Sequence, residues 1–490
     1  MANNSDTEQT PLIVVVPVAP PRRRYPHSTL RRACSVLLGT ILILAVFSYL
    51  ILAFAVPDCR DQKRHGQRNR HCVSKHPFFR PDSAVANTQE FTYDDLLDVL
   101  SSTPKEEQAE QWSRYYASGP HLAGKNLSQA LWTRDRWQEW GVPNTQVAAY
   151  DVYVNYPRDH GLRLFEKVNG SATPEDAQWK LKFEASLEED VLEEDSTSGL
   201  GDRIPTFHGY SASGNVTAPY MFCNYGTYED YRQMLAANIS LEGKIALVKY
   251  GRNFRGLKVQ RAQELGMVGV VMYSDPGDDG DMTEEKGEKP YPEGPARQPS
   301  SVQRGSVQYL ATAPGDPTTP GYPSLPGAPR QPANHSTPSI PSLPISYLDA
   351  LPLLKALNGH GPNASSMGEW WNNRGLEYKG VQYNIGPSPD HLALSLMNDQ
   401  EYVTTPMWNV IGIINGTLSD EVVILGNHRD AWIAGGAGDP NSGSAAMNEV
   451  VRSFGVALAK GWKPLRTIVF ASWDGEEYGL IGSTEWVEEH

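Results

Sequence analysis

A histidine and three carboxylates have the types and spacing of a metal site that activates water. His428 closes one apolar run, Asp439 follows it, and Glu476 and Glu477 stand where a second apolar run ends. Zinc binds neutral imidazole and carboxylate oxygens, one carboxylate can bridge two ions, and an unligated carboxylate can take a proton from bound water. These residue types predict a pair of divalent metal ions, with Glu476 and Glu477 dividing the roles of base and ligand.

Two strands and a helix must position these residues. Residues 421–428 and 466–474 are predicted to be buried strands, and residues 445–460 carry apolar side chains at helical spacing behind Asp, Asn and Ser as candidate N-caps. A βαβ unit is almost always right-handed and brings the carboxyl ends of its parallel strands to one edge of the sheet. We therefore expect the imidazole and the carboxylates to converge at that edge.

Each of these residues alone has an ordinary structural explanation. A histidine after a strand is usually a turn residue, and a pair of glutamates before a helix suits the positive helix N-terminus. The presence of the whole set favours the metal site.

The strings around these residues resemble the glutamate carboxypeptidase II family, the N-acetylated alpha-linked acidic dipeptidases, which also includes the transferrin receptors. The strings are Gly426–Trp432, Asp439–Gly443 and Phe470–Trp486, within a similarity from about Leu96 to the last residue. The resemblance implies that His428 binds one zinc ion, Asp439 bridges both, Glu477 binds the other and Glu476 is the general base. The turn before Asp439 is one residue longer than is usual in the family.

The resemblance also implies the architecture, an α/β fold of the zinc-exopeptidase type. Its mixed sheet would have helices on both faces and be interrupted by an inserted protease-associated, or apical, domain, after a single N-terminal transmembrane helix. Strand, helix and strand patterns at 244–250, 255–265 and 268–275 fit the inserted unit. The expected parts are a cytoplasmic tail (1–32), a transmembrane helix (33–56), a stalk (57–95), a first peptidase part (96–156), the apical domain (157–400) and a second, incomplete peptidase part (401–490).

Residues 33–56 carry no charge and are long enough to cross a bilayer as one helix. A cleaved signal peptide is the rival interpretation, but no small-residue cleavage site follows. Lys and Arg residues flank the span on both sides, so the orientation depends on glycosylation acceptors after the span. A type II membrane protein with a luminal or extracellular C-terminal side, at the plasma membrane or in endosomes or vacuoles, is expected. The acceptors are Asn126, Asn169, Asn215, Asn238, Asn334, Asn363 and Asn415.

Composition limits the remaining possibilities. With 490 residues, 40% hydrophobic residues and a net charge of −14, the chain can form two or three domains, and its acidity argues against a nucleic-acid partner. Cys59 and Cys72 in the stalk could pair within or between chains, whereas Cys223 is expected to be a buried thiol.

The resemblance implies a structural calcium ion bound by Thr319, Tyr322, Glu485 and Glu488. The two glutamates are three residues apart on a predicted helix and share a face, which suits calcium but is also common on solvated surfaces. With the matching turn at 315–323, they favour a calcium ion that holds the apical loop against the peptidase domain. The Pro/Gly-rich segment 275–344 is accordingly expected to be ordered rather than a linker.

Arg255 matches the family arginine that reaches the terminal carboxylate of the substrate, although pairing with a nearby acid is an alternative. Ser306 stands where the glutamate-selective member has asparagine, which weakens the case for a strict glutamate preference. His121, in the loop 120–124, is expected to be a loop residue rather than a ligand.

The expected function is a membrane-anchored binuclear zinc peptidase of the carboxypeptidase or dipeptidase type, with two zinc ions and one calcium ion. It would remove C-terminal residues, glutamate among them, from small peptides. A transferrin-receptor-like binding protein is one alternative. An inert short form is another, because the family's later aspartate and histidine ligands are not among the 490 residues. A homodimer is expected only where the family's C-terminal helical domain is present.

Overall fold

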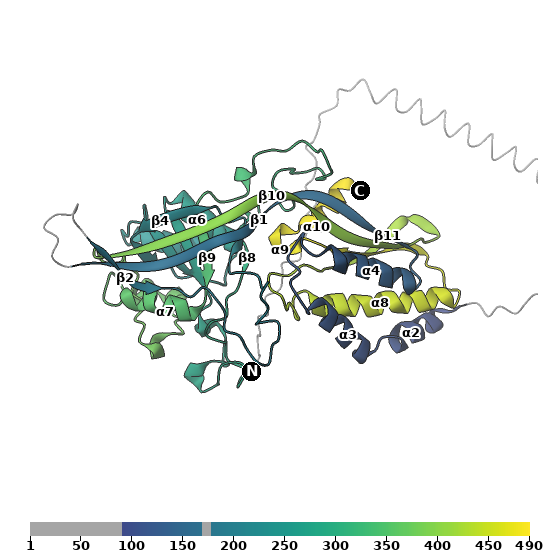
Figure 1. Ribbon diagram of the computed structural model, residues 1–490, viewed down its shortest axis with the longest axis horizontal. Helices are drawn as coiled ribbons and strands as arrows, with labels where there is room; N and C mark the ends of the chain where they lie inside the picture. The colour runs from purple at the N-terminus through teal and green to yellow at the C-terminus, as the bar shows by residue number, and fades with distance from the viewer. Residues whose placement is uncertain (1–90, 169–177) are drawn as a thin grey trace, which may run out of the picture. The chain divides into compact units, whose positions relative to one another are not determined.

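Two long antiparallel strands run through the fold (Figure 1). The computed structural model describes residues 91–168 and 178–490. Strand β1 (Asn144–Lys167) pairs with β10 (Leu392–Ile414) along nearly its whole length. β-Branched and aromatic residues at alternate positions favour such extended backbone. The one irregularity is a bulge between Pro157 and Asp159, where β1 holds an extra residue, Arg158.

Strands β1 and β10 form a two-stranded ribbon whose two ends pair with different strands. At one end β10 pairs with β12 (Arg466–Trp473), and at the other it pairs with β4 (Gly214–Ala218). Strand β11 (Leu418–His428) continues the sheet beyond β12, and β2 (Trp179–Glu184) continues it beyond β1. The boundaries predicted for the apical domain, residues 157 and 400, lie opposite each other on the ribbon.

The predicted βαβ unit is present. Strands β11 and β12 are parallel, with His428 opposite Trp473, and helix α8 (Asn441–Ala459) connects them. Helix α8 begins earlier than predicted. Its N-cap is Pro440, which makes no side-chain capping bond, so the expected cap by an Asp, Asn or Ser side chain is wrong.

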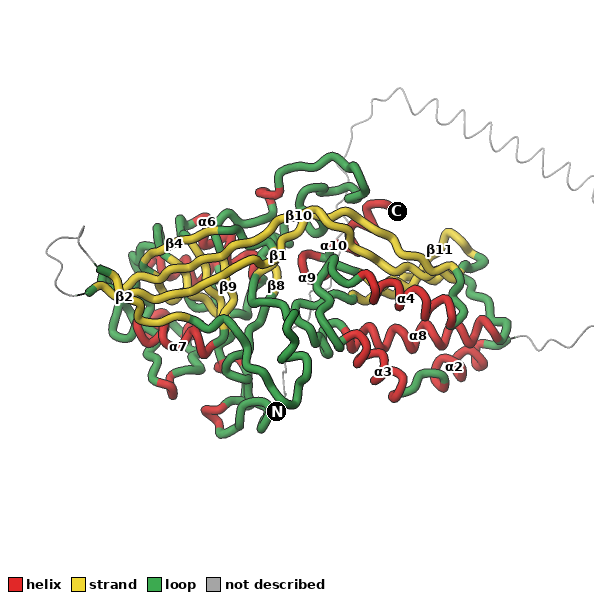
Figure 2. Tube along the Cα trace, viewed as in Figure 1, coloured by secondary structure: helices red, strands yellow, loops and turns green. Residues whose placement is uncertain are grey.

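Helices cover both faces of the sheet at the end that contains β11 and β12, as expected (Figure 2). On β12, Phe470 packs toward α8 and α4 (Leu127–Glu139), while the alternate residues Val469 and Ala471 pack toward α10 (Ile481–Glu489). Helices α2 (Tyr93–Ser102) and α3 (Glu106–Tyr116) pack against α8.

The prediction that residues 421–428 form a buried strand is wrong. Among the described strands β11 forms the edge of the sheet and pairs only with β12, so its apolar side chains are exposed from Val422 to Leu425. An apolar run alone does not distinguish a central strand from an edge strand.

The inserted unit has its own four-stranded parallel sheet. Its strands, in spatial order, are β5 (Tyr220–Phe222), β6 (Ile245–Lys249), β7 (Gly269–Tyr273) and β9 (Ser342–Ile345). Strands β6 and β7 are buried along their whole length, as parallel strands between helices usually are. The helices are α5 (Tyr228–Ala236), α6 (Arg255–Glu264) and α7 (Tyr347–Ala356). The predicted strand, helix and strand at 244–275 are therefore confirmed.

The segment 275–344 is structured, as expected, and buries Val307 and Tyr309. Its strand β8 (Gly305–Ser306) pairs in parallel with β3 (His208–Gly209). The remaining elements are α9 (Glu476–Gly479) and 3-10 turns at Pro276–Asp278, Glu284–Lys286, Ala333–His335, Ala364–Met367, Glu369–Trp371 and Glu377–Lys379.

The predicted cytoplasmic tail (1–32), transmembrane helix (33–56) and most of the stalk (57–95) lie outside the described residues. Helix α2 begins at Tyr93, within the last part of the predicted stalk. In residues 91–168 and 178–490, no helix combines the length and apolarity needed to cross a bilayer.

Candidate metal and peptidase site

The ends of β11 and β12 carry the predicted residues to one place. Strand β12 ends at Trp473, and the chain turns through Gly475 into α9, which opens with Glu476 and Glu477. Gly475 has a φ of 72°, and a Cβ built on it would lie 2.2 Å from Met407 Sδ. A side chain at this turn would be strained and would clash, so glycine is required to aim α9 at His428.

His428 lies between two carboxylates. Its Nε2 is 2.9 Å from Asp439 Oδ1, and its Nδ1 is 3.9 Å from Glu476 Oε2. The longer turn before Asp439 therefore still brings this carboxylate to His428. The predicted convergence of the histidine with these two carboxylates is confirmed; their roles as ligand, bridge and base stay predictions.

The cluster carries excess negative charge: Asp430 is buried, Glu476 and Glu477 are half-buried, and Asp439 is exposed. Burial works against a charge on His428, but hydrogen bonds with Asp430 and Asp439 raise its pKa to about 11. Burial, with the charges of Asp430 and Asp439, raises the pKa of Glu476, and burial raises the pKa of Glu477 well above its usual value. A positive charge at His428 therefore stabilises the carboxylates, and a bound cation would do the same.

Asp430 is the functional residue that sequence reasoning missed. It is buried, and its two oxygens accept the backbone N–H groups of Glu476 (3.0 Å) and Glu477 (3.2 Å). Its Oδ1 also lies 3.6 Å from His428 Nδ1. Asp430 thus joins the end of β11 to the start of α9. The available signal was a carboxylate two residues after the candidate ligand histidine.

Glu477 is not as close to His428 as Asp439 and Glu476 are. Its backbone N–H donates to Asp430, and the charges of His428 and Asp439 act on its side chain. Across residues 91–168 and 178–490, no three His, Cys, Asp or Glu side chains are grouped closely enough to hold an ion. The structure therefore supplies the donor types for a metal centre without arranging three of them around one point.

Arg255 reaches this region from the inserted unit. Its Nε–H donates to the carbonyl of Ser306 (3.1 Å), and the Ser306 hydroxyl donates to the carbonyl of Tyr478 (2.7 Å) in α9. The guanidinium opposes the burial-driven rise in the pKa of Glu476. Arg255 is therefore held where its charge acts on the candidate base, and Ser306 faces the protein interior.

His121 is a loop residue, as expected, and holds the segment between the candidate ligands. It is buried, with Nδ1 2.7 Å from the Arg429 carbonyl and Nε2 3.4 Å from the Gly435 carbonyl. Burial lowers its pKa despite these two acceptors. His121 therefore contacts both ends of the loop that connects His428 to Asp439.

The predicted calcium residues also lie together. Glu485 of α10 accepts the backbone N–H groups of Asp316 (2.8 Å) and Ser324 (2.6 Å), and Glu488 accepts that of Gly321 (2.8 Å). Burial raises the pKa of Glu485 to about 7 and also raises that of Glu488.

Two further oxygens in this calcium cluster are buried without a hydrogen-bond partner among the described residues, Glu488 Oε2 and Thr319 Oγ1. Tyr322 contributes its backbone N–H to the Thr319 carbonyl (3.3 Å) and its hydroxyl to Pro329. The loop 315–330 thus lies against the buried Glu485 and the half-buried Glu488 and binds both carboxylates through backbone N–H groups.

Comparisons with known proteins identify the family. A sequence profile described as Peptidase family M28 matches residues 409–490, and one described as PA domain matches residues 212–310. The chain is 54% identical to "Probable glutamate carboxypeptidase" of Arthroderma benhamiae over 381 residues, which are 78% of this chain and 50% of that protein. It is 38% identical to "Vacuolar protein sorting-associated protein 70" of Saccharomyces cerevisiae over 392 residues, 80% of this chain and 46% of that protein.

A third relative is named for a different activity. The chain is 34% identical to "Aminopeptidase NAALADL1" of Rattus norvegicus over 420 residues, 83% of this chain and 53% of that protein. The chain spans about half the length of the curated relatives it matches. The matched segments, the inserted unit and the candidate site agree, and the chain belongs to the glutamate carboxypeptidase-like members of peptidase family M28.

Proposed function

We propose that the full protein is a binuclear zinc peptidase that removes C-terminal residues from small peptides. The observation that carries this proposal is the position of His428, with Asp439 at one ring nitrogen and Glu476 near the other. The donor types and the excess negative charge fit zinc, because divalent cations compensate clustered carboxylates and imidazole is a zinc ligand. His428 and Glu477 would each hold one ion, and Asp439 would bridge them.

The roles of the protein's own residues follow from their places. When bound, zinc polarises the scissile carbonyl and lowers the pKa of a bound water. Glu476, with its raised pKa, accepts the proton of the attacking water and returns it to the leaving amine. Arg255, held where its charge acts on Glu476, binds the free carboxylate of the substrate through its planar set of donors.

The substrate side chain is left broad in this proposal. The relatives include a protein named as a glutamate carboxypeptidase and one named as an aminopeptidase, and Ser306 directs its hydroxyl to Tyr478 rather than toward a substrate. Peptides that end in acidic or neutral residues are the class to test. A receptor-like binding protein is less well supported, because binding alone does not require a carboxylate poised as a base beside a ligand histidine.

A structural calcium ion and a membrane anchor complete the proposal. Glu485, Glu488 and the Thr319 and Tyr322 region would hold calcium, since two buried oxygens there have no partner among the described residues and calcium prefers several oxygen ligands. Residues 33–56 would anchor a type II protein whose C-terminal side is luminal or extracellular.

The adjacent glutamates provide a matched test. We expect Glu476→Gln to keep bound zinc and to lower kcat by about 10² to 10⁴, the usual contribution of general-base catalysis. Glu477→Gln should instead lose zinc. The test measures zinc content and peptide hydrolysis of the full-length protein. Near-normal turnover in Glu476→Gln would exclude it as the base, and a wild-type protein with neither zinc nor turnover would sink the peptidase proposal.

A further inference from the structure

Where β10 pairs with β4, one face of the ribbon packs on the core of the inserted unit and the other face is turned away from it; we call this second face the open face. Along β10, Met407 and Ile411 face the side that α10 covers, whereas Leu394 and Leu396 face the core of the inserted unit. Ala393 and Ser395 alternate with these last residues, so they lie on the face turned away from that core. Cross-strand pairing places Phe165 and Thr217 on the same open face.

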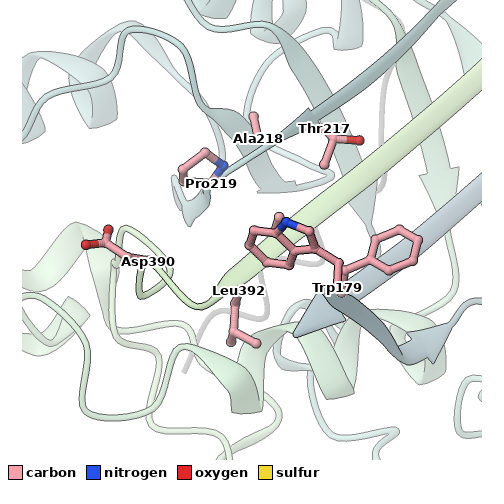
Figure 3. Close-up of a pocket in the computed structure, with 8 residues that line it drawn as sticks. Trp179, Thr217, Ala218, Pro219, Asp390 and Leu392 are labelled. Atoms are coloured by element: carbon pink, nitrogen blue, oxygen red, sulfur yellow. The ribbon is translucent and has the colours of Figure 1, made fainter. Parts of the chain in front are cut away.

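This open face forms an apolar groove of about 520 Å³ (Figure 3). That volume is within the range of about 300–1,000 Å³ that small-ligand sites occupy. The Trp179 side chain lies across the groove, with 45% of the residue exposed, and Asp390 supplies a carboxylate at one end. The lining residues are Phe165, Trp179, Thr217, Ala218, Pro219, Asp390, Leu392 and Ala393.

A glycosylation acceptor borders the groove. Asn215, Val216 and Thr217 form an Asn-X-Thr sequence on β4, and Thr217 itself lines the groove. Asn215 is exposed and two residues from Thr217, so its side chain leaves the same face of the strand at a spacing of about 7 Å.

Two other acceptors are engaged differently. The amide of Asn126 donates to the Pro120 carbonyl (3.2 Å), and that of Asn363 donates to the Gln382 carbonyl (2.6 Å). In both residues one of the two amide hydrogens is already bound to a backbone carbonyl. Asn215, on an exposed strand position, is better placed to carry one.

We propose that Asn215 carries an N-linked glycan whose first sugars lie in this groove against the indole of Trp179. A sugar ring has an apolar C–H face and a polar rim, which match the aromatic and aliphatic groove and the Asp390 carboxylate. Attachment to the groove's own strand raises the effective concentration of the glycan far above that of a free ligand. The glycan would thereby cover an apolar surface that is otherwise exposed to water.

This inference rests on the proposed luminal or extracellular location. The test distinguishes a failure of the inference from a failure of the proposed location. The full chain is produced in a glycosylating eukaryotic host, and occupancy is measured by glycopeptide mass spectrometry. We expect Asn215 to be modified in most molecules, Thr217→Ser to keep the modification and Thr217→Val to remove it. A chain modified at Asn238 or Asn334 but not at Asn215 would overturn the proposal alone; a chain modified nowhere would overturn the location as well.

The second measurement tests the groove. Under native conditions, we expect an endoglycosidase to release the Asn215 glycan about 3- to 10-fold more slowly than the one at Asn238, the factor that an aromatic contact would give. Trp179→Ala should remove the difference, whereas Trp370→Ala, which removes another exposed tryptophan, should not. Equal release rates in the wild type would overturn the contact. Self-association that depends on Trp179 in an unmodified chain would assign the groove to a second copy instead.

Discussion

Arg255 donates its Nε–H to the backbone carbonyl of Ser306 over 3.1 Å. Ser306 is bound in turn to Tyr478 of α9, the helix that begins with Glu476. The inserted unit is therefore attached directly to the candidate catalytic helix through one arginine and one serine. A substitution that keeps the positive charge of Arg255 but changes its hydrogen-bonding geometry therefore tests its role.

We expect Arg255→Lys to raise KM about 10- to 100-fold for peptides with a free C-terminal carboxylate and to change kcat less. Lysine keeps the charge but loses the planar fork that binds a carboxylate with two hydrogen bonds. The measurement is steady-state hydrolysis of paired peptides with free and amidated C-termini. Arg261→Lys is the matched control, because Arg261 lies on the same helix and pairs with Glu264 at the surface. An equal loss for amidated peptides would contradict carboxylate binding.

Asp430→Asn is expected to lower zinc affinity by about 10- to 100-fold, the usual effect of changing a residue that orients metal ligands. An amide group cannot accept both backbone N–H groups of Glu476 and Glu477 as the carboxylate does. Zinc affinity is measured by competition with a chelator.

The control for this prediction is Asp349→Asn. Asp349 is also buried and also accepts two backbone N–H groups, from Ser186 and Leu187, but lies in α7. It should lower stability and leave zinc affinity unchanged. Equal zinc affinity in wild type and Asp430→Asn would exclude the orienting role.

Calcium removal should lower the thermal midpoint of unfolding. An ion that binds only the folded state at about 100 times its Kd stabilises by about 2.7 kcal/mol. Glu488→Gln should abolish the calcium-dependent rise in Tm, since it removes one carboxylate from the pair with Glu485. Glu489→Gln is the neighbouring control, because Glu489 bonds Tyr150 instead. A calcium response that persists in Glu488→Gln would contradict the site.

His208 predicts a pH-dependent contribution to stability. Its Nε2 lies 2.8 Å from Tyr250 Oη, and that hydroxyl donates to the Gln303 carbonyl. The Nε2 must therefore carry the proton of a neutral ring, and Nδ1 accepts from Ser342 (3.0 Å). Burial, with the charge of Arg255, lowers the pKa of His208 well below 6.5.

The sign of this effect follows from proton binding. As pH falls below about 6.5, the unfolded chain takes up a proton at His208 before the folded protein does, so folding becomes less favourable by about 1.4 kcal/mol per pH unit. The stability advantage of the wild type over His208→Gln should shrink between pH 7.5 and 5.5 in chemical denaturation. The exposed residue His335 supplies the control variant His335→Gln. An advantage that is constant with pH would contradict a neutral His208.

The local chemistry could be predicted from the sequence better than the long-range pairing. His428, Asp439 and Glu476 are each fixed by the end of a strand or the start of a helix, and the βαβ rule brings such ends together. The position of Asp430 two residues after His428 makes it a candidate, but its partners could not be predicted, because they are backbone N–H groups that lie 46 and 47 residues away. Hydrophobic patterns contain no information about which backbone groups a side chain will meet.

The ribbon could not be predicted for a related reason. β-Branched and aromatic residues favour a strand at 146–154, but β1 continues to Lys167 through a proline and a run of polar residues. Those residues are extended because β10 pairs with them, and that partner lies more than 200 residues away in the chain. The exposure of β11 has the same origin, since neighbours in the sheet, rather than composition, decide whether a strand is covered.

The bulge at Arg158 determines which face of the sheet the later residues of β1 occupy. Before it, Tyr150 and Val152 pair with residues of β10 on the α10 side; after it, Leu162 and Leu164 pair with residues on the opposite face and enter the core of the inserted unit. The extra residue lets one strand serve two cores on opposite sides of the same sheet. If Arg158 instead took a regular place opposite Asp399, every later residue of β1 would change face and Leu162 and Leu164 would turn out toward the open groove, so the two cores depend on a single-residue offset.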